Sequence, residues 1–299
     1  MRAILQKIDS VFVSLLLLGA SACAQPIQRP SHTAQTLPKP SMAITAPTAP
    51  VRSKSYLGFD QNLYPGDAAL PALHRTFTFT GYWLNAPPGM DHSEWSGKRT
   101  ILARAGFGFM LLFNGRLYRD LHHKDAAALG RQDATEATRL AREQGFSAHS
   151  LLFLDMEEGG RMLPEQLAYI GAWLKDVREN GFRAGVYCSG IAVPDGPGHT
   201  ISTARDLDDH FPGTLLWIAD DATPPSPGCV AQALSPADSG FRTAFVWQFA
   251  QSPERRQYTG ASSATYSSDG NCYAPELPHS LRTALDLDTS NSPDPSGAR

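Results

Sequence analysis

The sequence predicts a single (β/α)8 barrel, the TIM-type architecture of the α/β class, over residues 54–288. Eight short apolar segments read as strands, and helical segments fill most of the gaps between them, which favours a parallel sheet. A doubly wound open sheet would satisfy this alternation as well. Several strands, however, end in acidic, amide or aromatic residues, and a closed barrel gathers such ends around one mouth. We therefore expect the barrel.

The first part of the barrel is expected to contain three strands and two helices. The segment 55–60 (SYLGFD) is a strand that ends in a carboxylate, and 77–83 alternates before it ends in aromatic residues. The segment 107–113 is almost continuously apolar, as expected of a strand that is covered on both faces. Between these strands, 67–75 and 96–105 have the composition of short helices.

The second part repeats the pattern. Its strongest helix is 164–180, where Pro164 suits the first turn and Gly181 ends the helix. The other helices are expected at 125–144, 204–210 and 278–284, and the strands at 150–154, 183–187, 215–219, 245–249 and 285–288. The segments 211–242 and 250–280 have little predicted structure and are expected to be long loops over the mouth or its rim.

The first 23 residues have the character of a secretory signal. Arg2 and Lys7 give a basic start, an apolar run covers 11–18, and small residues precede Cys23. The run is too short to span a bilayer, which takes about 20 residues. The small residues resemble a lipobox, which would make Cys23 a lipidated first residue; ordinary cleavage after Ala22 would instead give a secreted protein. Either outcome predicts an exported protein of the periplasm or cell envelope.

Two further segments are expected to be disordered. Residues 24–53 are rich in Pro, Thr, Ser and Ala, and residues 289–299 have a similar polar character. Neither segment can bury enough apolar surface to offset the entropy of ordering. We expect a flexible tether before the barrel and a frayed tail after it.

The net charge narrows the classes of binding partner that are expected. The net charge is −3 and basic residues are scattered, which excludes nucleic acid as the expected partner. We expect no cofactor, no metal, membrane contact only through a lipid anchor, and a monomer.

Of the four cysteines, three remain after Cys23, so one disulfide is expected in an oxidising compartment. Cys229 with Cys272 is favoured because both lie in long loops, but pairings with Cys188 stay open.

Asp155 and Glu157 are the sharpest chemical signal. They stand two residues apart at the end of an apolar strand, so both side chains project to the same side. Crowding of like charges raises the pKa of at least one carboxyl. A protonated carboxyl beside an ionised one is what acid-catalysed cleavage of a glycosidic bond requires. The alternative is that these residues only cap the strand end. Glu158 faces the opposite way and is expected to have a different role.

Two more aspartates and a set of aromatic residues are expected at the same mouth. Asp60 closes the first strand and Asp286 lies in the last, and these strands are neighbours in a closed barrel. Aromatic faces suit sugar rings, although an aromatic residue in a strand is more often part of the core. The candidate substrate-binding residues are Trp83, Tyr187, Trp217, Trp247 and Gln248.

Short motifs recur in a specific order along residues 55–288. They are G-F-D at 58–60, L-F-L-D-M-E at 152–157, G-V-Y at 185–187, L-W-I-A at 216–219, W-Q-F at 247–249 and D-L-D at 286–288. In this order the chain resembles the glycoside-hydrolase-like barrel domain known as domain of unknown function 1906. It is more distantly similar to the family-25 glycoside hydrolases, the lysozyme-type muramidases.

The resemblance implies roles for four catalytic residues. Glu157 matches the proton donor, and Asp155 matches the partner that orients or stabilises a reacting N-acetyl group. Asp60 and Asp286 match the aspartates of the first and last strands. Asp288 departs from the pattern, because family 25 usually has Asn there.

We therefore expect an exported glycosidase that acts on cell-wall glycan of the peptidoglycan type. One alternative is a glycan-binding barrel without catalysis. Another is a metal-dependent hydrolase, since clustered carboxylates also bind hard cations. His122 and His123 have no convincing metal spacing for the latter.

Overall fold

The computed structural model describes residues 54–222, 226–275 and 277–299 of the chain. The expected signal, its Cys23 and the expected tether lie outside the described residues. Within the described part, none of the helices is both long enough and apolar enough to cross a membrane.

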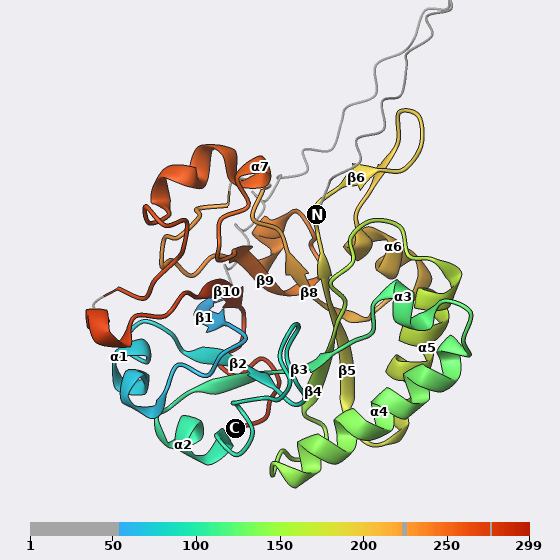
Figure 1. The fold of residues 1–299 in the computed structure, drawn as a ribbon, viewed down its shortest axis with the longest axis horizontal. Helices are drawn as coiled ribbons and strands as arrows, with labels where there is room; N and C mark the ends of the chain where they lie inside the picture. Colours follow the sequence, from blue (N-terminus) through green and yellow to red (C-terminus); the bar gives the residue numbers. More distant parts are fainter. Residues whose placement is uncertain (1–53, 223–225, 276) are drawn as a thin grey trace, which may run out of the picture. The chain divides into compact units, whose positions relative to one another are not determined.

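The core of the molecule is a closed barrel with strand order β1-β10-β9-β8-β5-β4-β3-β2 (Figure 1). This confirms the predicted single barrel and excludes the open sheet. The strands are β1 Tyr56–Asp60, β2 Phe79–Trp83, β3 Gly108–Asn114, β4 Leu151–Asp155, β5 Arg183–Ser189, β8 Leu215–Ala219, β9 Ala244–Ala250 and β10 Asp286–Ser290. A short hairpin of β6 Val193–Pro194 and β7 Thr200–Ile201 lies outside the barrel and was not predicted.

The two longest helices, α4 Ala126–Glu143 and α5 Pro164–Glu179, pack side by side on one flank of the barrel (Figure 1). The Asp125 side chain caps α4 by accepting from the Ala128 amide, and Pro164 occupies the first position of α5. Gly130 allows the close approach, since a Cβ there would stand 2.3 Å from the Tyr169 carbonyl oxygen. The remaining helices are η1 Asp67–Ala69, α1 Leu70–Leu73, α2 Arg99–Arg104, α3 Tyr118–Leu121, α6 Thr203–His210, η2 Pro236–Ser239, α7 Arg256–Thr259, η3 Gly260–Thr265 and η4 His279–Leu281.

The direction of the last strand corrects the all-parallel prediction. The strands from β1 to β9 in the barrel are parallel, but β10 is antiparallel to both β9 and β1. The expected helix at 278–284 is only the single turn η4. The described residues between β9 and β10 form only the short helices α7, η3 and η4, and β10 starts at the mouth, where Asp286 lies opposite Asp60, and runs downward.

The segment 289–299, expected to be disordered, is instead ordered. Thr289 and Ser290 belong to β10, and Ser296 and Ala298 are fully buried. The Ser296 amide donates to the Phe109 carbonyl at 2.8 Å, and the Leu111 amide donates to Ser296 Oγ at 2.9 Å. The polar tail that was expected to be disordered therefore hydrogen-bonds to backbone groups at the beginning of β3.

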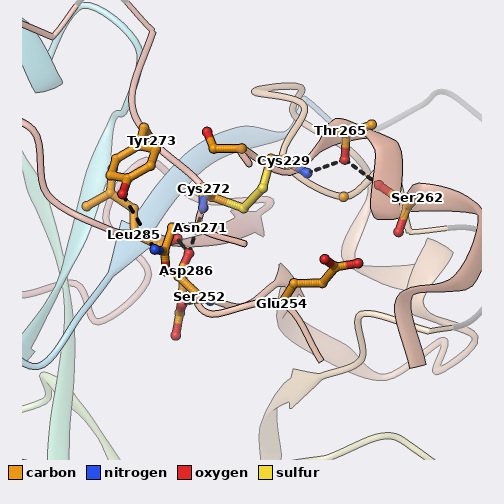
Figure 2. The surroundings of a disulfide bond; sticks show 12 residues. Cys229, Ser252, Glu254, Ser262, Thr265, Asn271, Cys272, Tyr273, Leu285 and Asp286 are labelled. Carbon is orange, nitrogen blue, oxygen red and sulfur yellow. Dashed lines mark hydrogen bonds between the residues drawn. A yellow bond between two sulfur atoms is a disulfide. The ribbon is translucent and has the colours of Figure 1, made fainter. Parts of the chain in front are cut away.

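A disulfide joins two of the long loops above the barrel. Cys229 and Cys272 are bonded at a sequence separation of 43, as the loop positions favoured. Cys188 is a buried free thiol. Figure 2 shows that the bridge lies close to Ser252 and Asp286, so it braces the loop that leads into β10.

Candidate active site

A cavity of about 150 Å³ opens at the mouth of the barrel, and all four predicted carboxylates line it. Asp60 ends β1, Asp155 ends β4, and Asp286 begins the antiparallel β10, so these three strand ends meet at one level. Glu157 follows Asp155 by two residues. The full lining is Asp60, Asn62, Trp83, Leu112, Asp155, Glu157, Tyr187, Gln248, Gln251 and Asp286.

Asp155 and Glu157 form the first carboxyl pair of the cavity. Burial raises the pKa of Asp155 well above its usual range, and the charges of Glu157 and Asp60 raise it further. Neither oxygen of Asp155 receives a hydrogen bond from the described residues. This environment suits a protonated carboxyl that donates its own proton to Glu157. The pKa of Glu157 is also raised, by loss of water around its carboxyl and then by the charge of Asp60, and the charge of Arg255 and the hydrogen bond from Asp155 only partly oppose this rise. The pair therefore holds a proton where an isolated carboxyl would have lost it.

Asp60 and Asp288 form a second pair. Asp288 is fully buried, and burial followed by the charge of Asp60 raises its pKa well above the usual range. The raised pKa favours a protonated Asp288, which can donate to Asp60, while Trp217 Nε1 donates to Asp288 Oδ1 at 2.9 Å. Gln248 Nε2 donates to Asp60 Oδ2 at 2.7 Å. Burial raises the pKa of Asp60 too, but these two donors oppose the rise, so Asp60 is the member of the pair that is more easily ionised.

Asp286 is held by the disulfide-braced loop. The Ser252 amide donates to Asp286 Oδ1 at 2.6 Å, and Ser252 Oγ accepts from the Cys272 amide at 2.9 Å (Figure 2). Burial, and then the charge of Asp60, raises the pKa of Asp286 well above its usual range. The position of this carboxyl therefore depends on a chain of contacts that begins at the disulfide.

Three predicted binding residues, Trp83, Tyr187 and Gln248, line the cavity. Tyr187 Oη donates to Gln248 Oε1 at 2.9 Å, and Gln251 Nε2 donates to the same oxygen at 2.7 Å. Since both contacts engage the carbonyl oxygen of Gln248, its amide nitrogen is directed at Asp60. The network therefore fixes the orientation of the donor that favours an ionised Asp60.

The other two predicted binding residues do not line the cavity. Trp217 is fully buried and packs edge-on against Phe153 and Tyr187, with ring centroids 5.6 and 5.1 Å away. Trp247 is 1 % exposed, and its indole nitrogen donates to the Asp220 carbonyl at 2.7 Å. Successive residues of a strand face opposite sides, so Trp247 faces away from the interior that Gln248 faces. Both tryptophans support the site from within the core.

Four residues of the site were not among the candidates. Asn62 lies two residues after Asp60, and the same alternation that pairs Asp155 with Glu157 could have indicated it. Asp288 was noted only as a departure from a family pattern. Leu112 and Gln251 carry no sequence signal, because one is an ordinary strand leucine and the other lies in a loop. Glu158, expected to act elsewhere, accepts from the Tyr118 amide and from Gln166 Nε2 at 2.7 Å each.

Across the parts of the chain that the structure describes, no group of three or more His, Cys, Asp or Glu side chains is arranged to hold a metal ion. The acidic residues are instead engaged in the two carboxyl pairs and with neighbouring amides.

Part of the chain matches a known family. Residues 96–232 match the model of the family described as the Rv2525c-like, glycoside hydrolase-like domain, which confirms the resemblance to a glycoside-hydrolase-like family. The matched stretch contains Asp155 and Glu157, whereas Asp60 and Asp286 lie outside it. None of the curated proteins matches the sequence.

Several solved structures are similar at low identity. A family 25 glycosyl hydrolase from Bacillus anthracis has a TM-score of 0.48 at 12% identity, covering 84% of this chain and 95% of its own. The Tat-secreted protein Rv2525c of Mycobacterium tuberculosis, in complex with HEPES, has 0.44 at 14%, covering 80% and 96%. The spore cortex lytic enzyme SleM of Clostridium perfringens has 0.47 at 15%, covering 83% and 70%. The fold assignment rests on the strand order of the barrel itself.

Proposed function

We propose that this protein is an exported glycoside hydrolase that cleaves cell-wall glycan of the peptidoglycan type by carboxylate acid catalysis. The observation that carries the proposal is the convergence of Asp60, Asp155, Glu157 and Asp286 on one cavity, where burial raises the pKa of all four carboxyls. Cleavage of a glycosidic bond needs a carboxylic acid to protonate the leaving oxygen and negative charge to stabilise an oxocarbenium-like state.

The roles follow from the surroundings of each carboxyl. Glu157 is the exposed member of its pair, so it can reach a glycosidic oxygen and deliver the proton. Asp155 is buried behind it and either returns the proton or orients the N-acetyl group of the substrate. Asp60, which two donors help to ionise, supplies negative charge opposite the developing cation. Trp83 and Tyr187 offer ring faces at the cavity wall.

Export is proposed from two independent features. The first 23 residues have the character of a secretory signal, with Cys23 as the candidate for lipidation. The Cys229–Cys272 disulfide fits an oxidising compartment. An exported enzyme meets the cell wall directly, either from a lipid anchor or as a free protein.

The test is digestion of purified peptidoglycan, with soluble fragments identified by mass spectrometry. Wild-type protein should release muropeptides, and Glu157→Gln should reduce the release at least about 100-fold, the contribution of a general acid. Glu179→Gln is the matched control, because Glu179 lies on the exposed side of α5 and its ion pair among the described residues is with Lys175. Equal release by wild type and Glu157→Gln would contradict the mechanism. No release from either, with retained sedimentation on the polymer, would favour a glycan-binding barrel instead.

A further inference from the structure

A second cavity, of about 470 Å³, adjoins the carboxylate cavity at the mouth of the barrel. Asn62 and Asp286 belong to the walls of both, so one extended ligand could occupy the two together. The second cavity lies between the segment that follows β1 and the end of the disulfide-braced loop. Its lining is Gln61, Asn62, Leu63, Ser252, Arg282, Thr283, Ala284 and Asp286.

Arg282 gives this cavity a fixed positive charge. The guanidinium lies 3.6 Å from the centroid of the Tyr273 ring, and Nη2 donates to Ser267 Oγ at 3.2 Å. No described carboxylate forms an ion pair with it, although Asp269, which accepts from the Tyr273 hydroxyl, lies near enough for Arg282 to lower the pKa of that carboxyl. Arg255 of the same loop differs, because it is bound to the buried Asp221. Arg282 is thus held by stacking and a neutral hydrogen bond, which leaves the donors of a planar fork for a ligand.

The opposite wall of the cavity offers apolar contact and an unused donor. Leu63 is 50% exposed, one of the few large apolar side chains that the described surface leaves open. Gln61 Oε1 accepts from Thr283 Oγ1 at 2.8 Å and so ties the two walls together. Gln61 Nε2 has no acceptor among the described residues. A buried amide without an acceptor destabilises the free protein, and an acceptor arriving in the cavity would relieve this.

We propose that the second cavity is an accessory subsite that binds a carboxylate-bearing substituent of the glycan, with Arg282 as the anion-binding residue and Leu63 as the apolar contact. The inference rests on the proposed function and names the substrate class more closely. The mouth beside it is lined by carboxyls, and an anionic substituent would not approach them without a compensating cation. Muramic acid residues of wall glycan carry such a carboxylate, whereas a homopolymer of N-acetylglucosamine does not.

The test is binding to two soluble tetrasaccharides, measured by calorimetry in the Glu157→Gln background so that no turnover occurs. One is the neutral N-acetylglucosamine tetramer, and the other alternates N-acetylglucosamine with N-acetylmuramic acid. The muramic-acid tetramer should bind about tenfold more tightly, and Arg282→Gln should remove that preference without changing the affinity for the neutral tetramer. Arg282→Lys should recover part of it. Arg256→Gln is the matched control, because Arg256 is an exposed arginine of the same loop that does not line the cavity.

The binding and digestion results together test the subsite and the proposed function separately. Equal affinities for the two tetramers, or an equal loss of both in Arg282→Gln, would overturn the subsite. If wild type still releases muropeptides from whole wall, the proposed function stands without it. If neither tetramer binds and the wall is not digested, both proposals fail together.

Discussion

Trp217 Nε1 donates a hydrogen bond to Asp288 Oδ1 at 2.9 Å, two residues below Asp286 in β10. The indole satisfies one oxygen, and the proton on the carboxyl is directed to Asp60. A protonated aspartic acid presents one acceptor and one donor, as an asparagine side chain does. A protonated Asp288 therefore has the same hydrogen-bonding pattern as an asparagine side chain.

We predict that Asp288→Asn stabilises the protein at neutral pH. The raised pKa of Asp288 means that folding takes up a proton, so stability is fully present below the unfolded pKa of about 4 and is lost as pH rises toward the folded pKa. Asparagine removes this loss. The melting temperature at pH 7.5 should rise by about 3 °C or more, and the difference should vanish near pH 4.

The control for this change is Asp209→Asn, since Asp209 is an exposed residue of α6. Its melting temperature should follow wild type at both pH values. A less stable Asp288→Asn at pH 7.5 would mean that Asp288 is ionised in the folded protein, contrary to the hydrogen bonding described here.

We predict that catalysis declines on the alkaline side as Glu157 loses its proton. Although Glu157 is an exposed residue, its carboxyl lines the cavity, and the loss of water there and the negative charge of Asp60 raise its pKa, so the decline should lie above the ordinary carboxyl range of about 4.3. Asp60→Asn removes that charge and should move the decline about one pH unit lower, whatever it does to the maximal rate. The measurement is the pH profile of kcat/KM for release of muropeptides. A profile that stays in place, or moves to higher pH, would argue against Glu157 as the acid.

We predict that breaking the Cys229–Cys272 disulfide weakens both stability and activity. Closing a loop of 43 residues stabilises a fold by about 4 kcal/mol in the chain-entropy view. The loss should lower the melting temperature by about 10 °C. Activity should decline further than stability alone explains, because the Cys272 amide holds Ser252, whose own amide holds Asp286.

This prediction is measured with Cys272→Ser and with reductant on wild type, assayed well below the melting temperature. Cys188→Ala is the control, since Cys188 is a buried free thiol in β5 and not part of the bridge. Full activity of Cys272→Ser at low temperature would show that Asp286 does not depend on the braced loop.

The sequence was informative where a local rule determines the position of a side chain. Alternation along a strand placed Asp155 and Glu157 on one side, and the neighbouring positions of first and last strands in a barrel brought Asp60 beside Asp286. The direction of β10 could not be predicted in this way, because its apolar pattern is the same in both directions. The described part of the long loop before β10 forms only short helices, none of them long enough for a crossover, and this is a weak signal in the sequence.

The roles of the aromatic residues were predictable only in part. Trp83 ends β2 and lines the cavity, whereas Trp247 lies in the middle of β9 and faces the outer layer. The difference depends on which side of its strand each residue faces. The pairing of β10 with β9 shifts register between Leu287 and Asp288, and a shift of one residue reverses the side that a side chain faces. The prediction of a disordered tail was wrong for another reason. The composition of the tail favours disorder, but composition does not reveal that backbone groups of β3 and β4 hydrogen-bond to it.

We predict that Ser296 contributes to the stability of the barrel through one buried contact at its lower end. Ser296 Oγ accepts the Leu111 amide at 2.9 Å, and both groups are buried. Ser296→Ala leaves that amide without a partner, which costs about 1–3 kcal/mol, and urea denaturation should show the loss as a lower midpoint with an unchanged slope. Ser147→Ala, at an exposed turn, should change the midpoint little. Because the mouth lies at the opposite ends of the strands, digestion of wall by folded Ser296→Ala should equal wild type. An unchanged midpoint would mean that residues 291–299 are not part of the folded barrel, as their composition first indicated.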